Sequence, residues 1–276
     1  MKIREHDLGV CSWSLLPKDT LELIGLVKQT GLEHIQLALN PLIGKDDAEV
    51  GAEVSQIRES GLKVTATMVG FPGEYYTTIA TIRETGGFVP EDRWLERREL
   101  TLRAGKLTAQ LGTTRLTTHV GYVPFSSDPG YAILVDRVRE VAHGLAADGV
   151  DLLMETGQEA ASELLQFLND LNCRNVGVNF DPANMILYGM EDPIEAIGIL
   201  NRHIRHVHVK DAVSSSQPRV MWGREVQFGT GEVGAEPLLD ALDQIGYQGP
   251  LCIEREVGRD RVASIREAVR TLQEAE

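Results

Sequence analysis

Cysteines are few in this sequence and long apolar runs are missing, and each of these shortages excludes a class of protein. The 276 residues include three cysteines, Cys11, Cys173 and Cys252, with no Cys-x-x-Cys pair. An odd, scattered set is not a disulfide framework and favours a reducing compartment. No apolar run approaches the ~20 residues that a membrane helix needs. The chain opens on the polar segment Met1–Asp7 rather than on a secretory signal, so we expect a cytoplasmic protein.

Positive charge is also in short supply. The chain has 27 Lys and Arg against 41 Asp and Glu, for a net charge of −14. Proteins that bind nucleic-acid phosphates need the opposite balance, so we expect neither a nucleic-acid nor a membrane partner. With 42% hydrophobic and 25% charged residues, the composition is otherwise that of a globular protein with room for a large core.

Short apolar runs alternate with longer segments whose apolar residues recur every three or four positions. The predicted strands are Leu8–Leu15, His34–Leu39, Lys63–Val69, Thr114–Val120, Val150–Thr156, Val176–Asp181, Ile204–Asp211 and Pro250–Glu256. The predicted helices are Leu21–Thr30, Ala48–Ser60, Asp92–Leu111, Tyr131–Ala147, Glu159–Leu171, Pro193–Asn201, Glu236–Ile245 and Arg261–Glu274. Eight repeats predict an α/β fold, a single-domain (β/α)8 TIM barrel over residues 1–276. An open doubly wound sheet is the alternative, but it usually needs fewer repeats.

Two connections are longer than a barrel requires. Gly70–Asp92 follows the third predicted strand, and Ala212–Val233 follows the seventh. Both leave from the carboxyl ends of strands, where barrel enzymes carry their active sites. We therefore expect both segments to line or cover the mouth of the barrel.

Polar residues end the last four predicted strands. Glu155, Asp181, His208 and Glu254 each follow apolar residues. Any one acid alone is also compatible with a strand-end salt bridge or a helix cap. Together, three carboxylates at one mouth would repel one another unless a cation lies between them. The sequence therefore predicts one divalent metal ion; oxygen and nitrogen donors suit Mn²⁺, Mg²⁺, Co²⁺ or Zn²⁺ without selecting sharply among them.

Four segments carry a resemblance to a known family: Met154–Glu155, Asn179–Asn184 (NFDPAN), His206–Asp211 (HVHVKD) and Ile253–Glu254. They resemble the xylose-isomerase-like TIM-barrel superfamily, which includes ketose 3-epimerases of the tagatose/psicose type, hydroxypyruvate isomerases, inosose dehydratases and apurinic-site endonucleases. The resemblance covers nearly the whole chain. It implies a small sugar or sugar-like substrate, and it makes the same four residues a single-metal set. Relatives occur as monomers, dimers and tetramers, so a homo-oligomer is possible.

Further residues are predicted to contact substrate. Gly223–Glu232 resembles the family's arginine followed by a Gly-x-Gly turn, which implies that Arg224 points toward substrate oxygens; a solvated loop arginine is the alternative. His119 and Trp13 lie near the ends of predicted strands, and core packing is the alternative for each. Lys210 shares its strand parity with His208, so it should face the same pocket. Gly229–Gly231 is too short to predict a phosphate cradle.

Asn184 departs from the family pattern, because ketose 3-epimerases carry a histidine at this position. An amide can hydrogen-bond a substrate hydroxyl but does not titrate near neutrality. This departure weakens the transfer of the exact epimerase substrate to this chain. The chain has only 7 histidines, which also argues against the three-zinc endonuclease arrangement.

These residues predict a metal-dependent sugar isomerase or epimerase that removes a proton next to a carbonyl through an enediolate. Glu155 and Glu254 are the predicted acid–base pair. A lyase or dehydratase acting on a keto-sugar or cyclitol would share the first deprotonation and stays open. A phosphodiesterase is disfavoured by the acidic charge, and a non-catalytic barrel by the complete ligand set.

Overall fold

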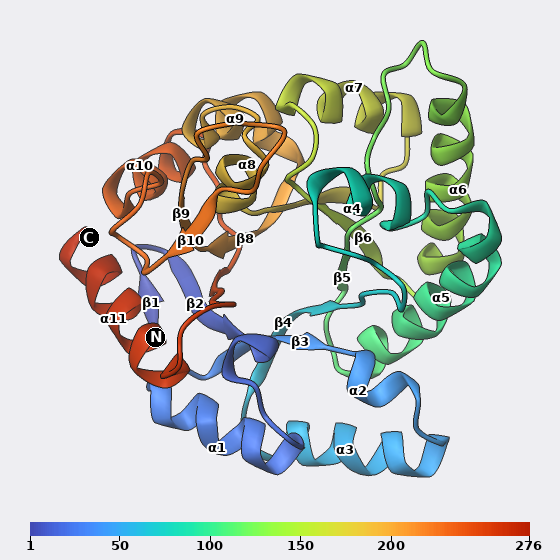
Figure 1. Cartoon of the computed structure of the whole chain (residues 1–276). Helices are drawn as coiled ribbons and strands as arrows, with labels where there is room; N and C mark the ends of the chain where they lie inside the picture. The colour runs from blue at the N-terminus through green and yellow to red at the C-terminus, as the bar shows by residue number, and fades with distance from the viewer.

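Eight parallel strands close into a barrel in the computed structural model, which covers residues 1–276 (Figure 1). Around the barrel they are β2 (His6–Cys11), β3 (His34–Ala38), β4 (Lys63–Met68), β5 (Arg115–Thr118), β6 (Asp151–Glu155), β7 (Val176–Phe180), β8 (Ile204–Val209) and β11 (Leu251–Ile253). Each strand pairs with the next, and β2 pairs with both β11 and β3, which closes the ring. The predicted (β/α)8 TIM barrel is confirmed.

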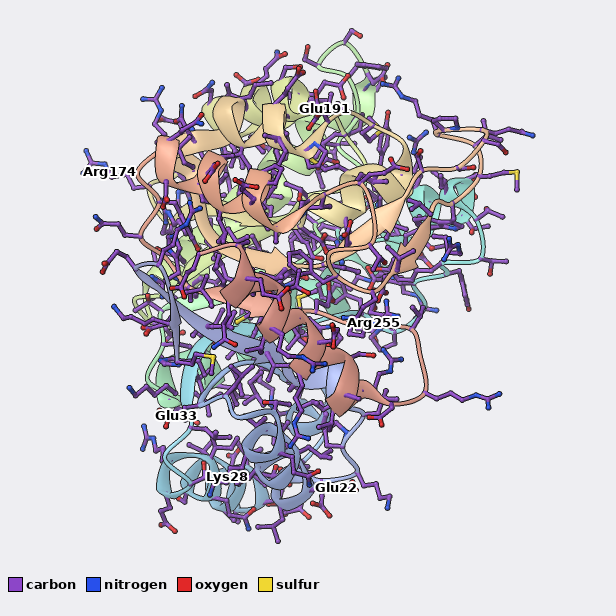
Figure 2. The ribbon with its side chains drawn as sticks, turned by 90° about the vertical axis from the view of Figure 1, so that its left-hand side faces the viewer. Glu22, Lys28, Glu33, Arg174, Glu191 and Arg255 are labelled. Carbon is purple, nitrogen blue, oxygen red and sulfur yellow. The ribbon has the colours of Figure 1, made fainter.

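The helices form an outer layer around the strands (Figure 1). They include α1 (Thr20–Thr30), α3 (Asp47–Glu59), α5 (Trp94–Gln110), α6 (Pro129–Ala146), α7 (Ala161–Leu171), α9 (Pro193–Leu200), α10 (Ala235–Gln244) and α11 (Arg261–Glu274). In α7, Leu164, Phe167, Leu168 and Leu171 repeat at helical spacing and are buried. Lys28 of α1 is exposed, and so is Arg174, in the turn before β7, which projects from the edge of the molecule in Figure 2. The main core therefore lies between the barrel and its helices.

The interior of the barrel is polar rather than aliphatic. Thr65 on β4 and His206 on β8 are on strands that are not neighbours, yet their side chains approach to 3.2 Å. The contact therefore runs across the interior. Asn179 lies beside Glu155 in one ladder and beside His206 in the other, where the register shifts between Val178 and Asn179. This register sets several polar side chains side by side below the mouth.

Several short elements were not predicted. The first predicted strand is too long, because it ends at Cys11 and Ser12–Leu15 form a 3-10 helix, η1. Leu16 then takes a left-handed conformation with φ 51°, which ends η1. The other short elements are β1 (Lys2–Ile3), α2 (Asn40–Ile43), α4 (Ile79–Thr85), η2 (Glu91–Arg93), α8 (Pro182–Tyr188), η3 (Asn201–His203), β9 (Asp211–Val213) and β10 (Arg224–Val226).

The two ends of the chain lie side by side (Figure 1). The backbone N–H of Arg4 donates to Glu276 Oε1 at 2.7 Å, and the Arg4 guanidinium pairs with Asp240 and Asp243 of α10. The short strand β1 runs antiparallel to β2 at the same end. No helix combines the length and the hydropathy that crossing a membrane requires.

Candidate active site

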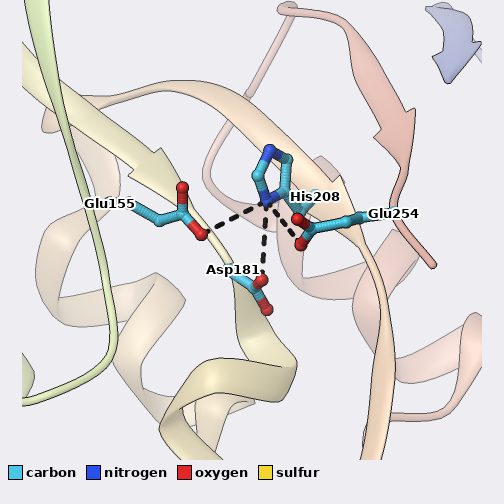
Figure 3. A group of neighbouring side chains, drawn as sticks. All are labelled: Glu155, Asp181, His208 and Glu254. Carbon is cyan, nitrogen blue, oxygen red and sulfur yellow. Dashed lines mark hydrogen bonds and ion pairs between the residues drawn. The ribbon is translucent and has the colours of Figure 1, made fainter. Parts of the chain in front are cut away.

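Four potential metal ligands converge at the carboxyl ends of consecutive strands (Figure 3). Glu155 ends β6, Asp181 follows β7, His208 belongs to β8, and Glu254 follows β11. One ligand atom from each residue lies within 4.8 Å of all the others, and all four residues are buried. Asp181 has two roles, because its Oδ1 also accepts the N–H of Asn184 and caps α8.

The ring of His208 is oriented so that Nδ1 faces the three carboxylates. Nδ1 lies 3.2 Å from Glu254 Oε2, 3.4 Å from Asp181 Oδ2 and 3.6 Å from Glu155 Oε1. On the other side of the ring, Nε2 lies 2.7 Å from the Gln36 side-chain oxygen, which can only accept. The Asn179 side-chain nitrogen also lies 3.1 Å from Nε2. Burial lowers the pKa of His208, but the surrounding negative charges, including Glu254 and Glu155, outweigh it and raise that pKa well above its ordinary value. A metal ion at Nδ1 would require the neutral ring, with its remaining proton on Nε2 toward Gln36.

The donor set fits a divalent cation. Oε2 of Glu254 is buried and accepts no hydrogen bond; its contacts are ion pairs with His208 Nδ1 at 3.2 Å and Lys210 Nζ at 3.0 Å. Three buried carboxylates outnumber the one lysine beside them, and a cation between the ligands would offset the remaining negative charge. Three carboxylate oxygens and one imidazole nitrogen are ligands that Mn²⁺, Mg²⁺, Co²⁺ and Zn²⁺ all accept. Glu155, Asp181, His208 and Glu254 are therefore a group that could bind a metal.

Lys210 supplies a buried positive charge beside these ligands. Its Nζ lies 3.0 Å from Glu254 Oε2, 3.6 Å from Asp181 Oδ2 and 2.6 Å from Glu256 Oε2. Burial raises the pKa of Glu254, but Lys210 and His208 outweigh it and hold that pKa well below its ordinary value. For Asp181, burial prevails over the attraction of Lys210 and raises the pKa to about 6.

Glu155 is held by two amides. Asn184 Nδ2 donates to Oε1 at 3.0 Å, and Asn179 Nδ2 donates to Oε2 at 3.3 Å. His119 Nε2 lies 3.7 Å from Oε1. Burial raises the pKa of Glu155, but His119 and His208 reverse the shift and lower it overall. Both glutamates of the group are thus kept ionised near neutral pH.

A cavity of about 950 Å³ opens above the four ligands. This volume is at the upper end of the range for small-molecule sites, ~300–1,000 Å³. Its aromatic lining consists of Trp13, Phe71, Tyr76, Tyr188 and Trp222. Both long connections contribute to it. The first supplies Gly70, Phe71, Pro72, Glu74 and Tyr76, and the second supplies Trp222, Gly223 and Glu225. The expectation that these two segments line the mouth is confirmed.

The two segments are built differently from plain loops. The first contains α4 and is held by the buried Arg97, which donates to the carbonyls of Thr85, Gly87 and Pro72. The second contains an antiparallel hairpin, in which Arg224 pairs with Val213 and Val226 with Asp211. Such hairpins and buried arginines keep long segments ordered at the mouth.

Comparison with known proteins decides the family. The family model of the xylose isomerase-like TIM barrel matches residues 24–275. The chain belongs to this family. Among solved structures, the xylose isomerase domain protein from Planctomyces limnophilus is 35% identical, with a TM-score of 0.85 over 91% of this chain and 89% of that one.

One further solved structure and one curated relative match at lower identity. An L-ribulose 3-epimerase is 20% identical, with a TM-score of 0.74 over 97% of this chain and 95% of that one. Inosose dehydratase from Geobacillus thermodenitrificans is 24% identical over 151 residues, which are 48% of this chain and 49% of that protein. The chain spans about half the length, or less, of the curated relatives it matches.

This family member gathers most of the predicted substrate residues at the metal ligands. Trp13 Nε1 donates to Glu254 Oε1 at 2.6 Å, and Lys210, Asn184 and His119 lie beside Glu155 or Glu254. All four line the cavity.

Arg224 is not brought to this group. Its side chain is exposed and does not line the cavity, whereas the next residue, Glu225, is buried and does. The reason is the alternation of β10, which turns adjacent side chains to opposite faces. The structure thus presents a carboxylate at the wall where the resemblance implies a guanidinium.

Sequence reasoning also missed two residues beneath the ligands. Gln36 and Asn179 are fully buried and hydrogen-bond His208 and Glu155. An amide side chain within a buried strand indicates a polar cluster, because the amide needs several hydrogen-bond partners. The sequence does not show which residues those partners are.

Proposed function

We propose that this chain is a metal-dependent isomerase or epimerase of a sugar or sugar-like ketose. The observation that carries the proposal is the pair of buried glutamates, Glu155 and Glu254, on either side of His208. Trp13 donates to Oε1 of Glu254, whose Oε2 faces His208 Nδ1. In Glu155 a single oxygen, Oε1, accepts from Asn184 and also faces His208 Nδ1. Two ionised carboxylates at one reacting carbon can remove a proton and return it.

Each residue of the site has a place in this proposal. A divalent ion, when bound, stabilises negative charge on the carbonyl and hydroxyl oxygens of the substrate. Glu155 and Glu254 hold and move the proton, since their lowered pKa values keep them ionised. Lys210 presents N–H donors from the cavity wall. Trp13 and Tyr76 offer apolar surface to the face of a sugar ring.

A dehydratase is the second candidate, because a relative that matches half of the chain is an inosose dehydratase. Dehydration next to a carbonyl begins with the same proton abstraction. It differs in the second step, where a hydroxyl leaves instead of the proton returning. Product analysis therefore separates the two: an epimer or isomer keeps the mass of the substrate, and a dehydration product loses one water.

The test is exchange of carbon-bound hydrogen with deuterium from solvent. The protein would be loaded with Mn²⁺ or Mg²⁺ and given ketoses, keto-sugars, cyclitol ketones and their phosphates, with NMR as the readout. Loss of a positioned base costs ~10²- to 10⁴-fold in rate, so we expect Glu155→Gln and Glu254→Gln to lose exchange by that factor. Glu236→Gln, at an exposed position of α10, is the matched control.

Two results would count against the proposal. Exchange that persists undiminished in both active-site variants would exclude Glu155 and Glu254 as the proton carriers. Purified protein that takes up no divalent metal, measured by titration calorimetry, would remove the basis of the mechanism.

A further inference from the structure

The walls of the cavity carry negative charge that the proposed chemistry does not use. Glu74, Glu225 and Glu256 line it above the metal ligands. Glu74 accepts the backbone N–H groups of Phe71 and Gly87, at 3.1 and 2.8 Å. Glu225 accepts from the backbone N–H of Glu256 at 3.1 Å. These bonds fix two of the three carboxylates in place, so they do not swing away from a bound ligand.

Apart from the proposed metal ion, the cavity offers no spare cation to an anionic substituent. Lys210 is its one lysine or arginine, and its Nζ already faces Asp181, Glu254 and Glu256. The nearby Arg255 binds Glu225 at 2.6 Å and the carbonyl of Val226 at 2.7 Å. Every buried positive group of the wall is therefore committed to a carboxylate of the chain itself.

The turn after β8 is also closed to phosphate. Barrel enzymes often bind phosphate with backbone N–H groups of the loops after the seventh and eighth strands. Here the N–H groups of Gly229, Gly231 and Val233 all donate to the carboxylate of Asp211, at 3.0, 2.9 and 3.0 Å. A Cβ at Gly231 would lie 2.3 Å from Asp211 Oδ1, so the turn is wrapped tightly around this side chain. The chain's own anion fills the place of a phosphate.

We infer that the substrate is an uncharged sugar, carrying neither phosphate nor carboxylate, and that the cavity walls exclude its phosphorylated forms. The inference rests on the proposed function, and it adds the substrate class. A phosphate group would bring about two further negative charges beside Glu225 and Glu256, where water screens them less than in solution. Like charges placed together are a common means of rejecting a wrong ligand.

Ligand binding can be measured without turnover. Trp13 and Trp222 line the cavity, so bound sugar should change the intrinsic fluorescence of the Mg²⁺-loaded protein. The probes are D-fructose and D-tagatose, each compared with its 6-phosphate. At low ionic strength we expect each neutral sugar to bind at least about tenfold more tightly than its phosphate. The ratio should shrink in 0.5 M salt, because salt screens the charges.

The variant Glu256→Gln tests the charge of the wall. The Glu256 side chain is half-exposed, so removing its charge should not disturb the fold. The variant should reduce the neutral-to-phosphate ratio by about threefold or more. Glu236→Gln removes the same charge from the exposed surface of α10 and should leave the ratio unchanged.

The outcomes separate this inference from the proposed function. Phosphates that bind as well as or better than neutral sugars overturn the inference, while hydrogen exchange on those phosphates would leave the proposed function standing. A ratio that Glu256→Gln leaves unchanged overturns the role of the wall. If no sugar of either kind binds or exchanges hydrogen, both proposals fail.

Discussion

The floor and the walls of the cavity are held together by different kinds of bond. The floor consists of Gln36, Glu155, Asn179, Asp181, His208 and Glu254. Its members lie in strands or directly after them, and most of their bonds join one side chain to another. Most of the wall consists of the segments 70–92 and 212–233, with Glu256, after β11, beside them. Their order depends on a few buried charged side chains that bind backbone groups, chiefly Arg97 and Asp211.

This difference separates chemistry from specificity. The floor follows from barrel closure, because strand order and register set its residues side by side. The walls do not follow from closure, and each can be rebuilt without moving the floor. Functional diversity in barrels arises mostly from such connections on a common scaffold. The predictions below change one region and ask whether the other responds.

The largest expected effect is on the wall formed by 70–92. Arg97→Met removes the guanidinium that binds three carbonyls and leaves buried acceptors without donors. We expect the free energy of unfolding to fall by about 3 kcal/mol. The affinity for divalent metal should change by less than about threefold, because the floor keeps all its bonds. Urea unfolding and titration calorimetry measure the two quantities.

The matched controls lie in the other wall. Val220 and Met221 are 67% and 52% exposed, and Val220→Ser and Met221→Ser should change stability by no more than about 0.5 kcal/mol. A value for Arg97→Met in the same range would show that Arg97 does not hold the wall. A large loss of metal affinity in this variant would show that floor and walls are one unit.

The fold was predictable because period and turn signals repeat eight times along the chain. What the sequence did not reveal are the short elements, and the reasons are local. Ser12–Leu15 continues an apolar strand pattern, yet the next residue, Leu16, has a left-handed backbone conformation. Glycine or asparagine would have signalled that conformation in the sequence, and leucine does not. The helix α4 lies inside a segment predicted only as a long connection, and Arg97, which anchors its end through Thr85, belongs to the next helix, α5, where the sequence pattern does not show which backbone groups it binds.

The second prediction concerns the floor. Gln36→Met removes the side-chain oxygen that lies 2.7 Å from His208 Nε2 and that can only accept a proton from it, and it also removes the bond to Thr117 at 2.8 Å. Loss of such a partner typically weakens metal binding by ~10- to 100-fold. Titration calorimetry measures the affinity, and ¹⁵N NMR of the ring reports whether His208 still carries its proton on Nε2. Gln29→Met, at an exposed position of α1, is the control.

A Gln36 variant with unchanged affinity and an unchanged ring tautomer would refute the positioning role. Restoration of the acceptor by Gln36→Glu should recover part of the affinity. The stability of the wall provides a second check. Urea unfolding of the Gln36→Met variant should show that the segment 70–92 does not unfold before the rest of the protein.

The ligand residues were predictable, whereas their supports were not. Glu155, Asp181, His208 and Glu254 end successive strands, so parity and position alone bring them together. Gln36 reaches His208 across the barrel, and the register shift between Ile35 and Gln36 that places it is invisible in the sequence. For Arg224 the sequence suggested the wrong orientation. Adjacent side chains of β10 point to opposite faces, so a shift of one residue decides whether Arg224 or Glu225 faces the cavity.

The last prediction compares two buried glutamates four residues apart. His119 and His208 lower the pKa of Glu155, but burial and then the charge of Glu163 raise the pKa of Glu159 to about 8. The folded chain therefore keeps the Glu159 carboxyl protonated at pH values where the unfolded chain, with a pKa near 4.5, has lost the proton. Between these values the native state binds more protons, so stability falls as pH rises, by at most ~1.4 kcal/mol per pH unit.

The variant Glu159→Gln abolishes this contribution to the pH dependence of stability. Urea unfolding in EDTA at pH 5.5, 6.5 and 7.5 should show the variant gaining on the wild type as pH rises, whereas Glu236→Gln should run parallel to the wild type. Parallel curves for Glu159→Gln would mean that the carboxyl of Glu159 is ionised in the folded protein, like that of Glu155.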